Sequence, residues 1–171
     1  MQEQVLQAAE SLFYERGIQT VGMDEIRAAS GVSLKRLYQL FPSKEALVAG
    51  YLERRDKRWR GSLASYVAAS SGPPVLAVFD WLHQWFAEPG FRGCAFVNSY
   101  GELGATSAGI AGIARHHVEQ IKVYVRGLVG TDELAEQILV LVEGAIAVAA
   151  LRNDPSVAWP AKAAAKALIS G

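Results

Sequence analysis

Cysteine is nearly absent from this chain of 171 residues, since Cys94 is its single thiol. One thiol excludes an internal disulfide and favours a reducing compartment. Long apolar runs are absent too, because the longest, residues 145–151, is far too short to span a bilayer. The first residues lack the basic segment and apolar run of a secretory signal. The sequence therefore predicts a soluble, cytoplasmic protein with no membrane contact.

Motifs of catalysis and metal binding are equally scarce. The sequence has no Gly-rich phosphate loop and no His, Cys, Asp and Glu set with metal-ligand spacing. Residues 105–109 resemble a nucleophile elbow, but that motif requires a strand-to-helix turn, and no alternating strand pattern is present. We therefore expect no enzyme, no catalytic residue, no metal and no cofactor. Cys94 is expected to be a buried, inert thiol, with a redox sensor as the alternative.

Net charge is zero, from 17 Lys and Arg against 17 Asp and Glu, but the charge is segregated along the chain. Residues 27–60 hold nine basic and three acidic residues, whereas residues 61–171 hold seven basic and nine acidic ones. This segregation favours a protein with one nucleic-acid-binding end. A solvated helix face is the alternative. For Arg54, Arg55, Lys57 and Arg58 we expect a solvated face in preference to phosphate contact.

Helical periodicity is what the chain has in abundance, with 51% of its residues hydrophobic. The pattern predicts an all-α fold, and its clearest break is Ser70-Ser71-Gly72-Pro73-Pro74. Besides two short helices between residues 23 and 40, we expect helices at 2–16, 44–69, 75–87, 95–103, 107–129, 131–152 and 157–170.

The two short helices form a predicted helix-turn-helix, with residues 23–30 first and residues 34–40 second. Gly31 suits the left-handed backbone that often follows a helix, and Ser33 is a good N-cap for the second helix. Pro42-Ser43 ends the second helix and caps the next one. The side chains expected to face inward from the second helix are Leu34, Leu37 and Phe41. Such a motif places its second helix in a DNA major groove.

The candidate DNA contacts divide into reading and positioning groups. Arg36 suits guanine and Gln39 suits adenine, each through two hydrogen bonds, and Lys35 begins the same outward face. Ser33, Tyr38 and Lys44 suit phosphate, through a helix N-terminus, a hydroxyl and a point charge. For Tyr38, core packing beside Leu37 is the alternative.

Residues 5–48 resemble the N-terminal domain of the TetR family of bacterial transcription regulators. The segments that carry the resemblance are residues 5–9, Leu12-Phe13, Gly17, 24–26, 30–33, Leu37-Tyr38, Phe41, 43–45 and Leu47. Two positions depart from the family. Val21-Gly22 stands where the family often has a Thr pair, so a hydroxyl cap is lost. Leu40 stands where the family often has His, so one phosphate contact is missing or is supplied by Lys44.

The resemblance implies an N-terminal three-helix helix-turn-helix domain, residues 1–48, and a C-terminal helical ligand-binding and dimerisation domain, residues 49–171. It further implies a homodimer that sets two recognition helices in successive major grooves of a palindromic double-stranded operator. A small molecule in the C-terminal domain would then change their separation and release a repressor. Control by a protein partner, or no control at all, is the alternative.

Aromatic residues gather in the middle third of the chain and favour a pocket for an apolar or aromatic ligand. Trp81 and Trp85 are four residues apart and share a helix face, as do Phe96 and Tyr100. Asn98, Glu102 and His117 are polar groups that suit orienting a ligand. For every one of these rings, core packing is the alternative. The candidate ligand residues are Trp59, Trp81, Trp85, Phe86, Phe96, Asn98, Tyr100 and His117.

The last two long helices carry a wide apolar stripe with small residues, which favours a four-helix dimer interface. Core packing within one chain is the alternative, and part of the stripe must serve it. The candidate interface residues are Leu134, Ile138, Leu141, Val142, Ala145, Ala149, Ala161, Ala165 and Leu168.

Overall fold

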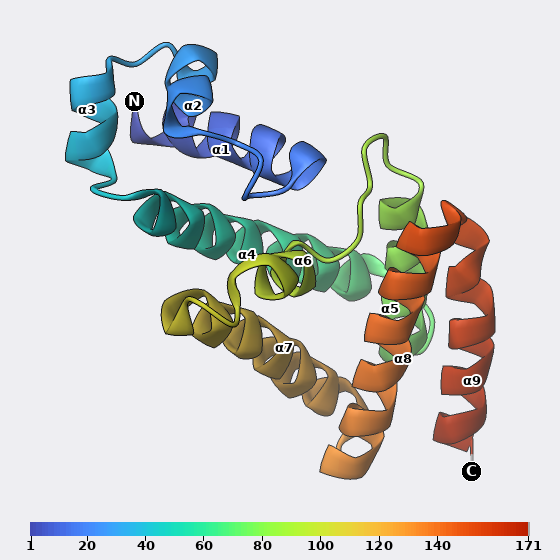
Figure 1. Cartoon of the computed structure of the whole chain (residues 1–171). Helices are drawn as coiled ribbons and strands as arrows, with labels where there is room; N and C mark the ends of the chain where they lie inside the picture. The colour runs from blue at the N-terminus through green and yellow to red at the C-terminus, as the bar shows by residue number, and fades with distance from the viewer. Residues whose placement is uncertain (171) are drawn as a thin grey trace. The chain divides into compact units, whose positions relative to one another are not determined.

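A computed structural model describes residues 1–170 of the chain. All regular structure in that range is helical, in the order that Figure 1 shows. The helices are α1 (Gln2–Arg16), α2 (Met23–Ser30), α3 (Leu34–Leu40), α4 (Lys44–Ala69), α5 (Pro74–Phe86), α6 (Ala95–Leu103), α7 (Ala108–Val129), α8 (Asp132–Arg152), the 3₁₀ turn η1 (Pro155–Val157) and α9 (Ala158–Ser170). The predicted all-α fold is confirmed, and every expected helix end lies within one residue of its position.

Packing divides the helices into two units. The first unit holds residues 1–57 and 95–116, and the second holds residues 58–94 and those from 117 onward. Helices α4 and α7 each continue from one unit into the other without a break. The expected boundary after residue 48 marks a change of role, which packing does not test, so it stays a prediction.

The boundaries of α2 and α3 follow from local chemistry. Gly31 has a φ of 71°, in the left-handed region that favours glycine, and it ends α2. The Ser33 hydroxyl accepts the N–H of Arg36 at 3.2 Å and so caps α3. Ser43 caps α4 in the same way, by accepting the N–H of Ala46 at 3.0 Å. Each of these features was predicted, and each is confirmed.

The core of the first unit anchors the short helices. Ile26 of α2 and Leu37 of α3 are fully buried, and Phe41 at the end of α3 is buried as well. Leu34 was expected to face inward, but 43% of its surface is exposed, so that prediction is wrong. The reason is that Leu34 opens a helix of seven residues, one turn before Leu37, and Leu37 with Phe41 already anchors the helix.

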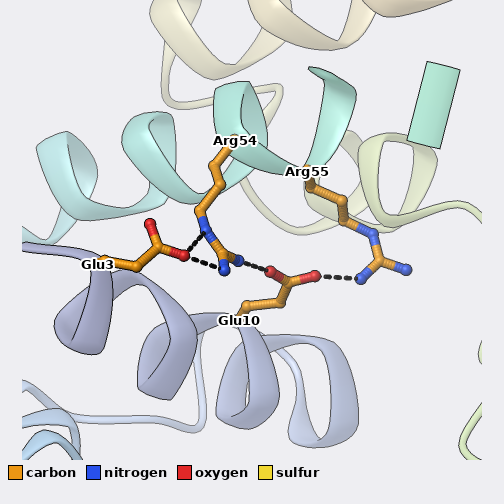
Figure 2. A network of polar contacts seen from close by, with 4 residues as sticks. All are labelled: Glu3, Glu10, Arg54 and Arg55. Atoms are coloured by element: carbon orange, nitrogen blue, oxygen red, sulfur yellow. Dashed lines mark hydrogen bonds and ion pairs between the residues drawn. The ribbon is translucent and has the colours of Figure 1, made fainter. Parts of the chain in front are cut away.

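An ion-pair network joins α1 to α4 in the first unit (Figure 2). Arg54 of α4 donates hydrogen bonds to Glu3 and Glu10 of α1, and Arg55 donates to Glu10 at 2.8 Å. The guanidinium of Arg55 also lies 3.9 Å from the ring centroid of Tyr14. Because Arg54, Arg55 and Glu10 are partly buried, the network fixes α1 against the first half of α4.

Helices α5, α8 and α9 pack together in the second unit. Most of α5 is buried, and its Asp80 pairs with Lys162 of α9 at 2.5 Å. Asn153 ends α8 in the left-handed conformation, and Asp154 caps η1 by accepting the N–H of Ser156 at 2.9 Å. These caps turn the chain so that α9 returns along α5 and α8.

Helix α8 is, by length and composition alone, long and apolar enough to cross a membrane. Core helices of soluble proteins pass the same test. In this chain Ile138, Val142 and Ala149 of α8 are buried within the second unit. The apolar character of α8 is therefore used at least in part for packing.

Candidate nucleic-acid interface

The exposed face of α3 holds most of the predicted DNA contacts. Leu37, with no exposed surface, faces the core, which turns the neighbouring positions outward. Lys35 and Gln39 are exposed, and 45% of the Tyr38 surface is exposed. The exposure of Tyr38 argues against the alternative that this ring is a core residue.

Arg36 is half-buried and lies between the exposed residues and the core. One terminal nitrogen, Nη1, donates to Oε1 of Gln39 at 3.3 Å. Its Nε is buried and makes no hydrogen bond to any residue from 1 to 170. The two side chains assigned to base reading therefore lie against each other, and the guanidinium keeps donors for a further partner.

Ser33 and Lys44 lie at the N-terminal ends of α3 and α4. The Ser33 hydroxyl is exposed and accepts from the N–H of Arg36, so a helix N-terminus with free N–H groups opens beside it. The Lys44 ammonium lies 5.9 Å from the ring centroid of Phe13, which is buried in the core of the first unit. Both positions suit a phosphate, and the assignment stays a prediction.

The basic first half of α4 is not one uniform surface. Arg54 and Arg55 are tied to Glu3 and Glu10 of α1 (Figure 2), so part of their charge is neutralised within the chain. This partly buried role differs from both the solvated face and the phosphate contact considered for them. Sequence reasoning missed it because the acidic partners lie more than 40 residues away.

Some of the candidate ligand residues gather in the second unit. We call Trp59, Trp81, Trp85, Phe91 and His117 the aromatic cluster. The ring centroid of Trp59 lies 4.9 Å from that of Trp81, 5.4 Å from that of Trp85 and 5.3 Å from that of His117. Trp81 and Trp85 stack with centroids 5.7 Å apart, which confirms that they share one helix face.

The surroundings of the aromatic cluster are partly polar. The indole N–H of Trp81 donates to the Ser62 hydroxyl at 3.2 Å. Phe86 adjoins the cluster, with its ring centroid 5.8 Å from that of Trp85. All three tryptophans and His117 are buried. In edge-to-face and stacked contacts of this kind, each ring is partly covered by its neighbours.

The remaining candidate ligand residues, Phe96, Asn98 and Tyr100, lie on α6 in the first unit. Phe96 is buried, whereas Asn98 is exposed and half of the Tyr100 surface is exposed. The shared face expected for Phe96 and Tyr100 thus passes from the core to solvent over one helical turn. Their role in ligand binding stays a prediction.

Glu102, which was considered for orienting a ligand, has a different contact. Its carboxylate accepts the backbone N–H groups of Ile18 and Gln19, in the loop between α1 and α2. No local pattern signals this contact, because the partners are backbone groups more than 80 residues away.

The candidate dimer residues differ in exposure. Many are buried inside the second unit, so they serve the core of a single chain. The exposed apolar residues on the same helices are different ones, with Leu151 exposed over 87% of its surface and Val140 over 64%. The buried candidates are Ile138, Val142, Ala145, Ala149, Ala161 and Ala165, and the partly exposed ones are Leu134, Leu141 and Leu168.

Cys94 is buried near the start of α6. Among residues 1–170, no group of three or more His, Cys, Asp or Glu side chains is placed to hold a metal ion. Neither observation adds a further chemical site to the two regions above.

Comparison with known proteins identifies the helix-turn-helix part. Residues 5–51 match the sequence pattern of the bacterial regulatory proteins of the tetR family. Over 56 residues the chain is 43% identical to an uncharacterized HTH-type transcriptional regulator of Mycobacterium tuberculosis. That match covers 33% of this chain and spans only 28% of the relative's length.

Similarity to solved structures extends over nearly the whole chain. SCO4454, a TetR-family transcriptional regulator from Streptomyces coelicolor, is 26% identical, with a TM-score of 0.89 over 98% of this chain and 93% of that one. The reduced form of NemR from Escherichia coli is 21% identical, with a TM-score of 0.86 over 96% of this chain and 94% of that one, and it shows the fold alone. The helix-turn-helix match and the fold agree, and the chain belongs to the TetR family of helix-turn-helix transcriptional regulators.

Proposed function

We propose that this protein is a repressor that binds a palindromic operator as a homodimer, in the cytoplasm, and is released by a small apolar or aromatic ligand. The observation that carries DNA reading is the outward face of α3, which presents Lys35, Tyr38 and Gln39 beside Arg36. A regulator of this family acts by binding and not by catalysis.

In the proposed complex α3 enters the major groove, where Arg36 donates two hydrogen bonds to guanine O6 and N7. Gln39 reads adenine, and Lys35 reaches a base edge at the start of the helix. Ser33, Tyr38 and Lys44 bind phosphates and so position the helix. The Arg36–Gln39 hydrogen bond supports this division, because it holds the two reading side chains together before DNA is bound.

The proposed dimer uses α8 and α9. The exposed residues Val140, Gly144, Ala147 and Leu151 repeat at helical spacing along one face of α8, and Trp159 of α9 is partly exposed. An apolar row of this kind in water favours contact with a second copy. The buried candidate residues would then lie in the core beneath the interface, and Leu134, Leu141 and Leu168 would lie at its margin.

The proposed ligand binds against the aromatic cluster, where flat rings favour an apolar or aromatic molecule. Because the rings of Trp59, Trp81 and Trp85 already contact one another, a ligand that inserts between them must displace at least one ring. Phe86 is a further proposed ligand contact within the second unit, and His117 provides a polar group beside Trp59. In the first unit, Phe96, Asn98 and Tyr100 stay separate candidates for ligand contact.

The same ring contacts favour a second candidate function, a regulator controlled by a protein partner or not controlled at all. Tryptophan fluorescence with a panel of aromatic compounds separates the two. A saturable change in emission that accompanies release of DNA supports the ligand-released repressor. Unchanged emission and unchanged DNA binding across the panel support the second candidate.

Selection of binding sites from random duplex DNA, at a stated salt concentration, tests the proposal as a whole. Enrichment of a two-fold palindrome is the expected result, because two recognition helices in a symmetric dimer read two inverted half-sites. Salt-sensitive binding without enrichment would contradict the proposal, since it would reflect only non-specific attraction to phosphates.

A further inference from the structure

The end of α6 is bound to the loop between α1 and α2 through Glu102. Oε1 accepts the N–H of Ile18 at 2.9 Å, and Oε2 accepts the N–H of Gln19 at 2.8 Å. The side-chain amide of Gln19 donates back to the backbone carbonyl of Glu102 at 2.6 Å. Three hydrogen bonds thus join one residue of α6 to two consecutive residues ahead of the helix-turn-helix.

The loop is shaped to receive this carboxylate. Gly17 has a φ of 86°, and a Cβ added there would lie 3.4 Å from both carboxylate oxygens of Glu102. Glycine therefore meets a backbone requirement at this position, and the carboxylate lies within ordinary van der Waals range of it. On the other side of the contact, Ile18 and Val21 are buried in the core of the first unit, so the loop cannot shift without moving core side chains.

The position of Glu102 on its own helix is unfavourable without these partners. A carboxylate in the last turn of a helix meets the negative end of the helix dipole. The backbone N–H groups of Ile18 and Gln19, which lie beyond the end of α1, donate to the carboxylate and offset that cost. Hydrogen bonds to a charged acceptor are stronger than neutral ones. The contact therefore has a specific physical cause and is not a passing approach of two exposed groups.

A second contact ties the turn between α6 and α7 to the other end of the helix-turn-helix. The Ser107 hydroxyl accepts the N–H of Ile110 at 3.1 Å and donates to Glu45 in the first turn of α4, shortly after α3. The end of α6 and the turn that follows it are thus bonded both before α2 and after α3. Such a pair of contacts restrains the direction in which α3 points, beyond what the loops alone would do.

We propose that Glu102 is a positioning residue that sets the orientation of the helix-turn-helix against the α6–α7 turn, and so the half-site spacing that the dimer accepts. This inference rests on the proposed function, because spacing matters only for a dimer on two half-sites. Glu102 touches no base; it acts through the loop that precedes α2.

The test compares Glu102→Gln with Glu88→Gln, which removes the same charge at an exposed position just after α5. Glutamine keeps the size of Glu102 but turns an NH2 group toward one N–H donor, so at least one hydrogen bond is lost. Operators are prepared with the selected spacing and with one base pair inserted or deleted between the half-sites. Thermal unfolding of both variants shows how much of each change is loss of folded protein.

We expect the wild type and Glu88→Gln to lose about tenfold or more in affinity on a change of one base pair, and Glu102→Gln to lose only about threefold, since a looser orientation tolerates a displaced half-site. Base preferences within each half-site stay the same, because α3 is unchanged. An equal loss at every spacing, or a wild-type spacing profile in Glu102→Gln, would overturn the proposal.

Hydrogen exchange separates this inference from the proposed function. At least one of the two amides, Ile18 or Gln19, is expected to exchange about tenfold faster in Glu102→Gln than in Glu88→Gln, because it loses its acceptor. Unchanged exchange would overturn the Glu102 contact without any use of DNA. Failure of the wild type to enrich a palindrome would instead overturn the proposed function.

Discussion

The outward face of α3 and the aromatic cluster are held in place by different kinds of interaction. Residues of α3 are oriented by local features, a Ser33 cap at one end and the buried Leu37 beneath. The aromatic cluster brings together Trp59 of α4, Trp85 of α5 and His117 of α7, which are far apart in the chain. A change on the α3 face should therefore alter binding and spare the fold, whereas a change in the cluster should alter both.

Trp85→Ala, a change in the aromatic cluster, should have the largest effect of these variants. The Trp85 ring contacts the rings of Trp59, Trp81 and Phe91, so its removal leaves a cavity among aromatic neighbours. We expect the free energy of unfolding to fall by about 3–5 kcal/mol. Denaturant unfolding measures this loss. A loss below about 1 kcal/mol would mean that the ring lines a ready-made pocket and does not support the core.

Arg36→Ala is the corresponding change on the outward face of α3. Operator binding should weaken by about 1–3 kcal/mol, with relaxed preference at one base position, while the free energy of unfolding stays nearly unchanged. Titrations of cognate and random duplexes measure the difference. Lys57→Ala is the control, because it removes one positive charge from an exposed position on α4. Equal losses on cognate and random DNA would contradict the reading role of Arg36.

The N-caps of α3 and α8 offer a matched pair of variants, one in the helix-turn-helix and one outside it. Ser33 caps α3 and Thr131 caps α8, and each accepts one backbone N–H. Ser33→Ala and Thr131→Ala should each cost about 1 kcal/mol of stability, because a helix donor loses its acceptor. Only Ser33→Ala should also weaken operator binding. A similar loss of operator affinity in Thr131→Ala would show that the effect comes from stability alone.

The smallest effect concerns pH and Glu143 of α8. Burial raises the pKa of the Glu143 carboxyl above its ordinary value, and its Oε1 makes no hydrogen bond to any residue from 1 to 170. The folded chain then holds this proton more tightly than the unfolded chain does. The resulting stability is fully present below the unfolded pKa and is lost as pH rises through the raised folded pKa.

Glu143→Gln should therefore flatten the decline in stability as pH rises through this window. Thermal unfolding across about pH 4 to about pH 8 measures the slope, with Glu88→Gln as the exposed control. An unchanged slope in Glu143→Gln would show that this carboxyl does not titrate differently in the folded chain.

Helix boundaries and the identity of the α3 face could be predicted because they depend on neighbours within a few residues. Gly31, Ser33 and Ser43 act on the backbone directly beside them, and each was assigned correctly. Leu34 was assigned wrongly, because apolar spacing cannot tell how few anchors a seven-residue helix needs. The assignments of ligand and dimer residues followed the same apolar spacing, which does not separate a core face from an exposed one.

Burial and long-range polar contacts were decided only by packing. In the sequence, Arg54 and Glu102 cannot be told from exposed charged residues. In the structure, Arg54 joins α4 to α1, and Glu102 joins α6 to the loop after α1. Helix formation depends on local hydrogen bonds and caps, so it can be predicted from short segments of sequence. The partner of a charged side chain depends on which helices lie side by side, and that is settled only when the apolar faces of the whole chain are buried together.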